Sequence, residues 1–138
     1  MNVTFDTNVF VSGFTRPEGR AGQALANILN DGDVLFVSQF IIDELKRVLT
    51  EKFGWTAEDL TEVNAWFSTH TRVVTPTQTL NILADEPDNR ILECALAANA
   101  DLIVTGDRAM LELGRIEDTR IISLADYLRI VDNSSINR

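Results

Sequence analysis

The chain begins with Met1-Asn2-Val3-Thr4-Phe5, a largely apolar run that ends on Asp6-Thr7-Asn8. The β-branched and aromatic residues of this run predict a short buried β-strand. A carboxylate at the carboxyl end of a first parallel strand lies where open α/β sheets place their ligands. Because burying such a charge is unfavourable unless it is paired or binds a metal ion, Asp6 needs a partner.

Strand and helix patterns alternate along the rest of the chain. A loop is predicted over residues 13–22, a turn at Asp31-Gly32-Asp33 and a second loop over residues 76–86. Further strands are predicted at 34–37, 72–75, 101–105 and 120–122, and helices at 22–29, 39–53, 56–70 and 87–98, near 113 and after Ser123. This alternation implies right-handed crossovers and an α/β fold with a parallel sheet covered on both faces.

Helix starts carry the usual local signals. Ser38 and Thr56 are predicted N-caps, and Pro87 suits the first position of a helix. Ser123 with Asp126 three residues later approximates a capping box. With 138 residues the chain is long enough for one core. We therefore expect a single domain over residues 1–132 and a flexible polar tail over residues 133–138.

Charge restricts the classes of partner. The net charge is −9, and the only lysines are Lys46 and Lys52, against ten arginines. This balance argues against a general basic surface for polyanions. It leaves room for a nucleic-acid enzyme, because carboxylates that hold a divalent metal also add negative charge.

Single residues exclude several chemistries. Cys94 stands alone, so no disulfide can form within the chain, and its apolar helical surroundings favour a small buried side chain. His70 is the only histidine, which excludes multi-histidine metal sites and disfavours a Ser-His-Asp triad. We find no basic-then-apolar leader and no apolar run near about 18 residues. The expectation is a cytoplasmic protein without membrane association.

Four acidic residues fall where one edge of the predicted sheet would gather them. Asp6 and Asp107 each follow a strand, and Asp88 opens the helix before the fourth strand. Glu44 lies about two turns into the helix after the second strand, at the margin of its buried face. In a parallel sheet the strand ends that feed helices share one edge, so these acids are expected to converge.

Clustered carboxylates repel one another unless a cation compensates. Oxygen-only ligands select hard divalent cations, and an incompletely filled coordination shell leaves room for water and a substrate phosphate. The implied chemistry is metal-assisted phosphodiester hydrolysis, which needs no lysine or histidine base.

Each of these residues also has a purely structural interpretation. Asp88 and Asp107 could be helix N-caps, and Glu44 could be a solvated helix residue. Asn8 could bind loop backbone, and Thr105 could simply end a strand. Asp85 is a second-rank candidate that could reach a metal through a water, whereas Glu93 is expected to be peripheral. The joint placement of four acids favours the metal site.

Four segments, in order, resemble the PIN-domain family. They are Phe5–Ser12, Ser38–Leu45, Asp88–Ala95 and Val104–Asp107. Their order and spacing are most similar to the small single-domain PIN proteins of toxin–antitoxin systems, the relatives of the VapC toxins. The match spans nearly the whole chain, and although each motif alone is weak, the ordered set is specific.

The resemblance implies a fold, an activity and partners. The fold would be a three-layer α/β/α sandwich with a central parallel sheet of about five strands, as is usual for the family. The activity would be a Mg²⁺- or Mn²⁺-dependent ribonuclease acting on RNA. The protein would form a homodimer, and a cognate antitoxin protein would insert a segment that blocks the site.

Carried over by position, Asp6, Glu44, Asp88 and Asp107 match the family's catalytic, metal-binding acids. Asn8 and Thr105 match polar residues that support them. Many VapC toxins carry a further acid three or four residues after the strand-four motif. Met110 and Leu111 occupy those positions here, so the resemblance does not extend to a full second-metal site.

The nearest candidates for RNA binding are four arginines close to the proposed acids, namely Arg16, Arg20, Arg90 and Arg108. Ordinary surface charge is the alternative for each of them.

Two other functional classes share some of these features. Haloacid dehalogenase-type phosphatases and phosphate-receiver domains also gather acids at a sheet edge, but both use a lysine after a later strand, and this chain has none after Lys52. The non-enzymatic alternative is a catalytically weak or inactive PIN-fold protein that binds RNA or another protein. An intact acidic quartet argues against such decay, because repelling carboxylates are destabilising without metal.

Overall fold

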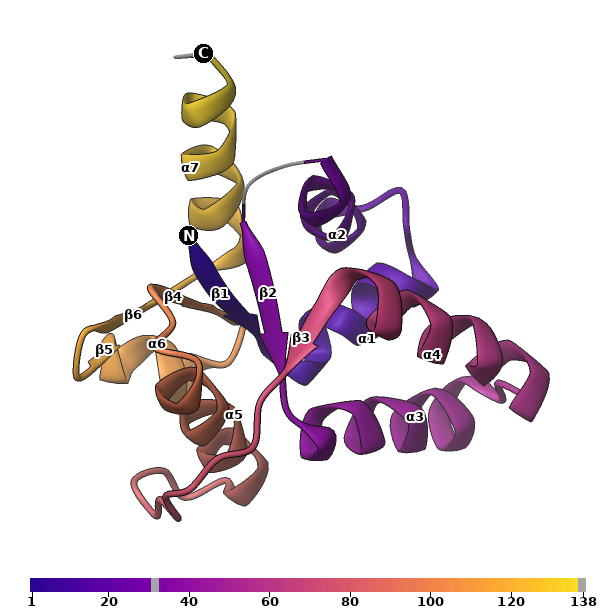
Figure 1. The fold of residues 1–138 in the computed structure, drawn as a ribbon, viewed down its shortest axis with the longest axis horizontal. Helices are drawn as coiled ribbons and strands as arrows, with labels where there is room; N and C mark the ends of the chain where they lie inside the picture. Colours follow the sequence, from indigo (N-terminus) through magenta and orange to yellow (C-terminus); the bar gives the residue numbers. More distant parts are fainter. Residues whose placement is uncertain (31–32, 137–138) are drawn as a thin grey trace.

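The computed structural model describes residues 1–30 and 33–136. Its centre is one sheet with the strand order β3-β2-β1-β4-β6-β5 (Figure 1). The strands are β1 (Asn2–Phe5), β2 (Val34–Val37), β3 (Thr71–Val73), β4 (Leu102–Val104), β5 (Arg115–Ile116) and β6 (Thr119–Ile122). Strands β1, β2, β3, β4 and β6 pair with one another in parallel, which confirms the predicted parallel sheet.

Strand β5 corrects the predicted strand number. It pairs antiparallel with β6 and adds a sixth strand at the edge of the sheet. The two strands are joined through Glu117 and Asp118, and Glu117 has a positive φ of 49°. The turns of tight β-hairpins usually have Asn or Gly at positions with a positive φ. This turn has neither residue, so the sequence pattern did not reveal it.

Seven helices are found among the described residues. They are α1 (Thr7–Thr15), α2 (Arg20–Asn30), α3 (Gln39–Phe53), α4 (Ala57–His70), α5 (Glu86–Ala97), α6 (Arg108–Leu113) and α7 (Leu124–Ile136). The connections from β1 to β2 and from β2 to β3 lead toward the β3 edge of the sheet. The connections from β3 to β4 and from β4 to β6 lead toward the opposite edge. Right-handed crossovers therefore put their helices on opposite faces, which gives the three-layer α/β/α sandwich.

Helix α1 was not predicted. The predicted loop over residues 13–22 shrinks to residues 16–19, because α1 reaches Thr15 and α2 starts at Arg20. The segment Val9–Val11 is rich in β-branched and aromatic residues, which favour strands. All three side chains of that segment are buried, so tertiary packing overrides local propensity here.

Helix boundaries with clear capping chemistry were predicted well. The Ser38 hydroxyl accepts from the amide of Ile41 at 3.3 Å, and Ser123 accepts from Asp126 at 3.1 Å. Thr56 forms a capping box with Asp59. Gly54, at φ 69°, ends α3 in the left-handed conformation.

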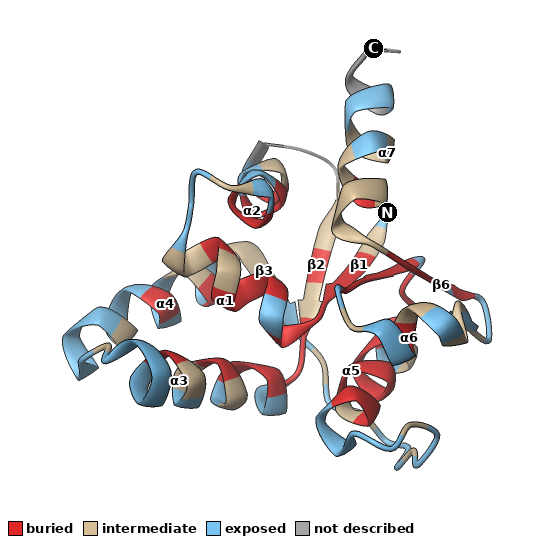
Figure 2. Cartoon of the chain, turned by 180° about the vertical axis from the view of Figure 1, so that it is seen from behind, coloured by how far each residue is buried: buried red, intermediate tan, exposed pale blue. Residues whose placement is uncertain are grey.

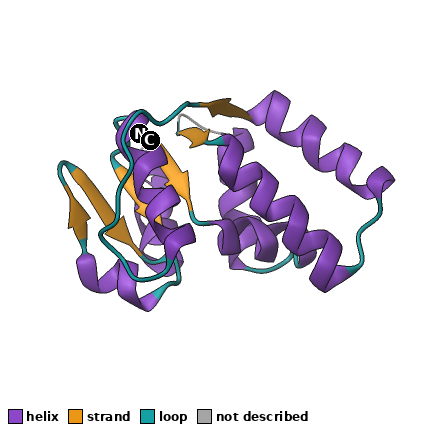
Figure 3. Ribbon diagram, turned by 90° about the horizontal axis from the view of Figure 1, so that it is seen from below, coloured by secondary structure: helices purple, strands orange, loops and turns teal. Residues whose placement is uncertain are grey.

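Burial separates two parts of the molecule. Buried residues concentrate in the sheet and in α5, whereas the outer sides of α3 and α4 are exposed (Figure 2). Helices α3 and α4 extend away from the sheet (Figure 3). The apolar faces of both helices still join the main core, α3 through Leu45 and Leu49 and α4 through Val63 and Phe67.

Three predictions concern the C-terminal tail, the turn at residues 31–33 and the bounds of the domain. Helix α7 continues to Ile136, so the first four residues of the predicted tail are helical. Residues 137–138 and the predicted turn residues Asp31 and Gly32 lie outside the described residues. The single-domain assignment over residues 1–132 stays a prediction. Among the described helices, none has the length and apolar character needed to cross a membrane.

Candidate metal centre

The strand order reverses between β1 and β4, and this reversal places the candidate site. Asp6 follows β1, and its amide donates to the carbonyl of Val104 in β4 at 2.9 Å. Asp6 is also the N-cap of α1, with Oδ1 accepting from the amide of Asn8 at 3.3 Å. A crevice at the carboxyl ends of strands on either side of such a reversal is where open α/β sheets bind ligands.

Thr105 links the ends of β1 and β4. Its fully buried hydroxyl donates to Oδ2 of Asp6 at 2.6 Å and accepts from the amide of Asp107 at 2.9 Å. Asp107 in turn caps α6, because its Oδ1 accepts from the amide of Met110 at 2.9 Å. One hydroxyl therefore fixes the position of two acids that belong to different strands.

Helix α5 brings two more acids to the same place. Asp85 occupies its N-cap position but makes no side-chain capping bond, and Asp88 lies in its first turn. One carboxylate oxygen from each of Asp85, Asp88 and Asp107 falls within 4.8 Å of the others. The positive end of the α5 dipole favours negative charge at this position.

The loop before α5 is held by side chains of α5 itself. The Asn89 amide accepts from the backbone amides of Ile82 and Leu83 at 3.0 and 2.9 Å and donates to the Leu83 carbonyl at 2.9 Å. The Glu93 carboxylate accepts from the Leu80 amide at 2.8 Å. Because this loop leads directly into Asp85, these bonds set where the Asp85 backbone lies.

The electrostatics of the cluster are those of uncompensated acids. Burial raises the pKa of Asp6 and Asp107 raises it further, while hydrogen bonds from Thr105 and Asn8 oppose the shift. The pKa of Asp88 rises to about 7, first through burial and then through repulsion by Asp107, Asp85 and Asp6. The other three aspartates are thus near enough to Asp88 to make its ionisation unfavourable.

A divalent cation fits this donor set. Asp88 is only 6% exposed, and its Oδ2 has no hydrogen-bond partner among the described residues. A buried carboxylate oxygen without a partner is rare and needs an explanation. Aspartate oxygens are hard ligands that suit Mg²⁺ and Mn²⁺. Asp85, Asp88 and Asp107 would hold the ion, with Asp6 beside them.

A comparison with protein families identifies the domain. Residues 2–109 match the model of the PIN domain. The chain belongs to the PIN-domain family. It is also 28% identical over 117 residues to an uncharacterized protein of Methanocaldococcus jannaschii, a match that covers 82% of this chain and 75% of that protein.

Two solved structures share the fold of this PIN domain. VapBC2 from Rickettsia felis, bound to a DNA fragment from its promoter, gives a TM-score of 0.61 at 17% identity, covering 89% of this chain and 98% of that one. VapBC-1 from nontypeable Haemophilus influenzae gives a TM-score of 0.59 at 18% identity, covering 91% and 99%. At these identities the similarity establishes the fold alone.

The side chains of two residues predicted for the site, Glu44 and Asn8, do not join the aspartate cluster among the described residues. Glu44 is held by Arg47 of the same helix through contacts of 2.7 and 3.2 Å, and it is not in the three-residue cluster found in the described part of this PIN domain. The Asn8 side chain is exposed, and the contact that Asn8 makes to Asp6 comes from its backbone. The proposed metal roles of Glu44 and of the Asn8 side chain stay predictions.

The four arginines predicted to bind RNA differ in what their side chains contact. Arg90 is engaged within the protein, with its guanidinium 2.8 Å from Glu93 and donating to the Leu80 carbonyl at 2.9 Å. Arg108 is exposed and pairs with Glu112 at 3.3 Å. Arg16 and Arg20 line a separate pocket. Glu93, expected to be peripheral to the metal site, is not in the aspartate cluster of the described residues; it is buried and holds both Arg90 and the loop before α5.

Proposed function

We propose that this PIN domain is a Mg²⁺- or Mn²⁺-dependent endoribonuclease and the toxin component of a toxin–antitoxin system. The observation that carries the proposal is the unpartnered Oδ2 of buried Asp88, a residue whose carboxylate clusters with those of Asp85 and Asp107. A protein that gathers repelling carboxylates at a ligand crevice gains from a bound cation. Family membership supports nuclease chemistry at this crevice.

The residues of the chain divide the work. Asp85, Asp88 and Asp107 would hold the ion, which when bound would activate a water and neutralise charge on the phosphodiester. The Thr105 hydroxyl and the Asn8 amide donate to the two oxygens of Asp6. These bonds favour the ionised form of Asp6 and fix its orientation beside the cluster.

The partners are proposed from the fold. Both similar structures are of proteins named VapBC. By analogy, an antitoxin protein would bind this chain and block access to its aspartates, RNA would be the substrate, and the active form would be a homodimer. Co-expression with the product of a neighbouring reading frame is expected to suppress RNA cleavage and growth arrest. Suppression without formation of a stable complex would contradict the antitoxin part of the proposal.

An RNA cleavage assay tests the activity. Cleavage of structured RNA is expected in Mg²⁺ or Mn²⁺, to stop in EDTA, and to be lost in Asp6→Asn and Asp107→Asn. Asp118→Asn is the matched control, because Asp118 is an exposed aspartate in the β5–β6 turn, at the opposite edge of the sheet. Cleavage that survives both site substitutions, or that is lost equally in the control, would exclude the proposed site.

A PIN fold that binds RNA or protein without cleaving is the second candidate. The ion pair between Glu44 and Arg47 favours it, because an acid held elsewhere leaves fewer ligands for a metal. This candidate predicts that Mn²⁺ leaves the melting temperature unchanged. The nuclease predicts a rise, because an ion that binds only the folded state stabilises it.

A further inference from the structure

Arg16 and Arg20 belong, with Arg72, Arg115 and Arg120, to the described arginines of this acidic chain that form no ion pair. Arg47, Arg90, Arg108 and Arg129 each contact a carboxylate. Within residues 1–30 and 33–136, by contrast, neither Arg16 nor Arg20 forms an ion pair, and both side chains are exposed. Exposed guanidinium groups without an ion pair are available to an anionic partner, even in a chain of net charge −9.

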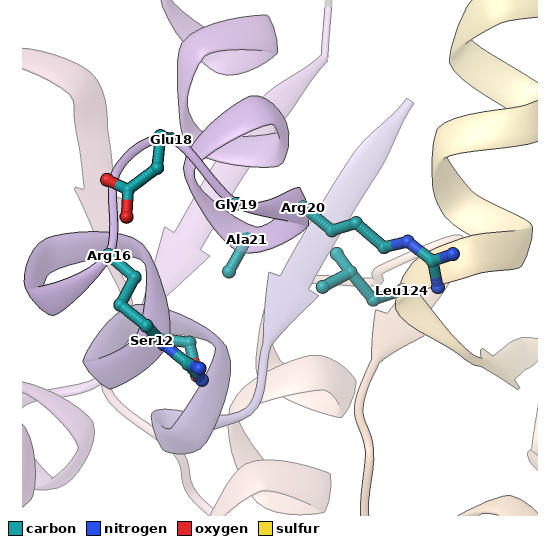
Figure 4. Close-up of a pocket in the computed structure, with 7 residues that line it drawn as sticks. All are labelled: Ser12, Arg16, Glu18, Gly19, Arg20, Ala21 and Leu124. Carbon is teal, nitrogen blue, oxygen red and sulfur yellow. The ribbon is translucent and has the colours of Figure 1, made fainter.

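Both arginines line one cavity of about 310 Å³, the arginine pocket, together with Ser12 of α1 and Leu124 at the start of α7. The Arg16 guanidinium lies beside Ser12, and the Arg20 side chain extends toward Leu124 (Figure 4). Glu18 also belongs to the lining, and among the described residues it forms no ion pair with either arginine. Both arginines therefore line the same pocket, with their guanidinium groups at different ends of it (Figure 4).

Backbone hydrogen bonds and close packing hold the connection between α1 and α2 that carries Arg16. The amide of Arg16 donates to the Ser12 carbonyl at 2.8 Å, and the amide of Gly19 donates to the Arg16 carbonyl at 3.0 Å. A Cβ on Gly22 would lie 1.9 Å from the Pro17 carbonyl oxygen, so only glycine permits this close packing of the connection on α2. The position of Arg16 at the pocket is thus fixed by the backbone rather than by a flexible loop.

The chemistry of the pocket suits a phosphate group. Guanidinium groups bind phosphate through paired hydrogen bonds, which ammonium groups cannot match in geometry. Helix α2 begins at Arg20, so the positive end of its dipole opens at the pocket and adds to the two charges. The Ser12 hydroxyl offers a neutral donor beside them.

The pocket and the aspartate cluster lie along one helix. Asp6 caps α1, and Ser12 follows six residues later, a distance of about 9 Å at the helical rise of about 1.5 Å per residue. We propose that the arginine pocket binds a backbone phosphate of the RNA on one side of the scissile bond. That the nucleic acid is RNA rests on the proposed function. The pocket would set the direction in which the RNA strand extends from the aspartate cluster.

Binding is measured apart from cleavage. A short fluorescein-labelled single-stranded RNA is titrated in EDTA with wild type, the double variant R16A/R20A and the control R115A. Arg115 is likewise exposed and without an ion pair among the described residues, but it lies on edge strand β5, away from the cluster. We expect about tenfold weaker binding for the double variant only, with the slope of log affinity against log salt reduced by about 0.7 for one lost phosphate contact.

Cleavage of two substrates sharpens the test. A dinucleoside monophosphate contains only the scissile phosphate and cannot reach the pocket. The double variant is therefore expected to show a raised KM on the longer RNA and unchanged cleavage of the dinucleoside monophosphate. A merely structural effect of the substitutions would reduce both activities and would lower the melting temperature.

The outcomes separate this inference from the proposed nuclease. Wild type that fails to cleave but binds RNA through Arg16 and Arg20 would refute the nuclease and support the pocket. A double variant that binds RNA as tightly as wild type, with the same salt slope, would overturn the pocket even if cleavage is confirmed. Loss of antitoxin binding with intact RNA binding would also overturn it, because the pocket would then hold carboxylates of a protein.

Discussion

The two sides of the aspartate cluster are built in opposite ways. At the β1–β4 side, Asp6 is 5% exposed and accepts hydrogen bonds on both carboxylate oxygens, from Asn8 and Thr105. At the α5 side, Asp88 is 6% exposed, and its Oδ2 lacks a partner within the described residues. The burial is nearly equal, but only Asp6 accepts hydrogen bonds on both carboxylate oxygens.

This difference assigns distinct tasks to two residues of the same type. Hydrogen bonds to the ionised form lower a carboxylate's pKa, whereas burial and like charges raise it. Asp6 experiences both effects, and Asp88 experiences the raising effects, with its pKa reaching about 7. Asp6 is therefore held in place before any ligand arrives, and Asp88 is where a cation would gain most.

The largest effect is expected from Asp88→Asn. Replacing even a supporting residue of a metal site costs about 10–100-fold in metal affinity, so loss of a direct ligand should reduce Mn²⁺ affinity and RNA cleavage by at least about a hundredfold. The same change removes a repelled buried charge, so the metal-free protein should melt at a higher temperature than wild type. Calorimetric titration with Mn²⁺ and melting curves in EDTA measure the two effects.

Asp118→Asn again provides the control, because it removes an exposed aspartate that has no part in the cluster. If the metal-free Asp88→Asn protein is less stable than wild type, the Asp88 carboxylate does not destabilise the folded state, and the proposed repulsion among the aspartates is contradicted. Retained Mn²⁺ affinity would remove Asp88 from the site.

The second effect is a pH dependence with an unusual sign. The pKa of Asp88 rises from 3.8 unfolded to about 7 folded. The folded state therefore binds the proton more tightly, and the stability contributed by protonated Asp88 is full below the unfolded pKa and is lost as the pH rises through the folded pKa. In EDTA this effect should lower the free energy of unfolding of wild type between about pH 4 and pH 7.

Saturating Mn²⁺ should abolish this fall, because the ion takes the place of the proton. Asp88→Asn should show a flatter profile in EDTA. Urea denaturation at several pH values gives the comparison, and a wild-type stability that rises over this interval would contradict the proposed surroundings of Asp88.

A smaller effect is expected from Thr105→Val. The change leaves Oδ2 of Asp6 and the amide of Asp107 without their shared partner. Leaving a buried polar group unsatisfied costs about 1–3 kcal/mol, so denaturation should show a loss of that order. Thr105→Ser keeps the hydroxyl and should restore most of the stability and the Mn²⁺ affinity. Equal behaviour of the two variants would assign Thr105 to packing alone.

The sequence predicted what local chemistry and topology determine. The boundaries of α3 followed from Ser38 and Gly54, and the parallel sheet followed from the alternation of elements. The convergence of Asp6, Asp88 and Asp107 followed from where parallel strands end and helices begin. These features depend on short-range signals or on rules that hold for any such sheet.

The features that were missed depend on side-chain direction and tertiary packing. Periodicity placed Glu44 at the margin of the buried face of α3, but it could not show that Arg47, one turn later, binds its carboxylate. Helical spacing placed Glu93 away from Asp88, but it could not show that the Glu93 side chain is buried and accepts a hydrogen bond from the loop before α5. Long-range packing of a loop leaves no periodic pattern in the sequence.

The smallest effect is expected from Glu44→Gln, which tests the weakest part of the predicted acidic set. Glu44 would have to leave Arg47 to reach a metal, but an exposed pair of this kind is worth only about 0.3–0.5 kcal/mol, so the ion pair is no serious barrier. If Glu44 is a ligand, Glu44→Gln and Arg47→Ala should change Mn²⁺ affinity in opposite directions, because the first removes a ligand and the second frees it. If neither changes the affinity, the ion pair is only a surface contact and the metal site consists of the aspartates on the two sides of the cluster.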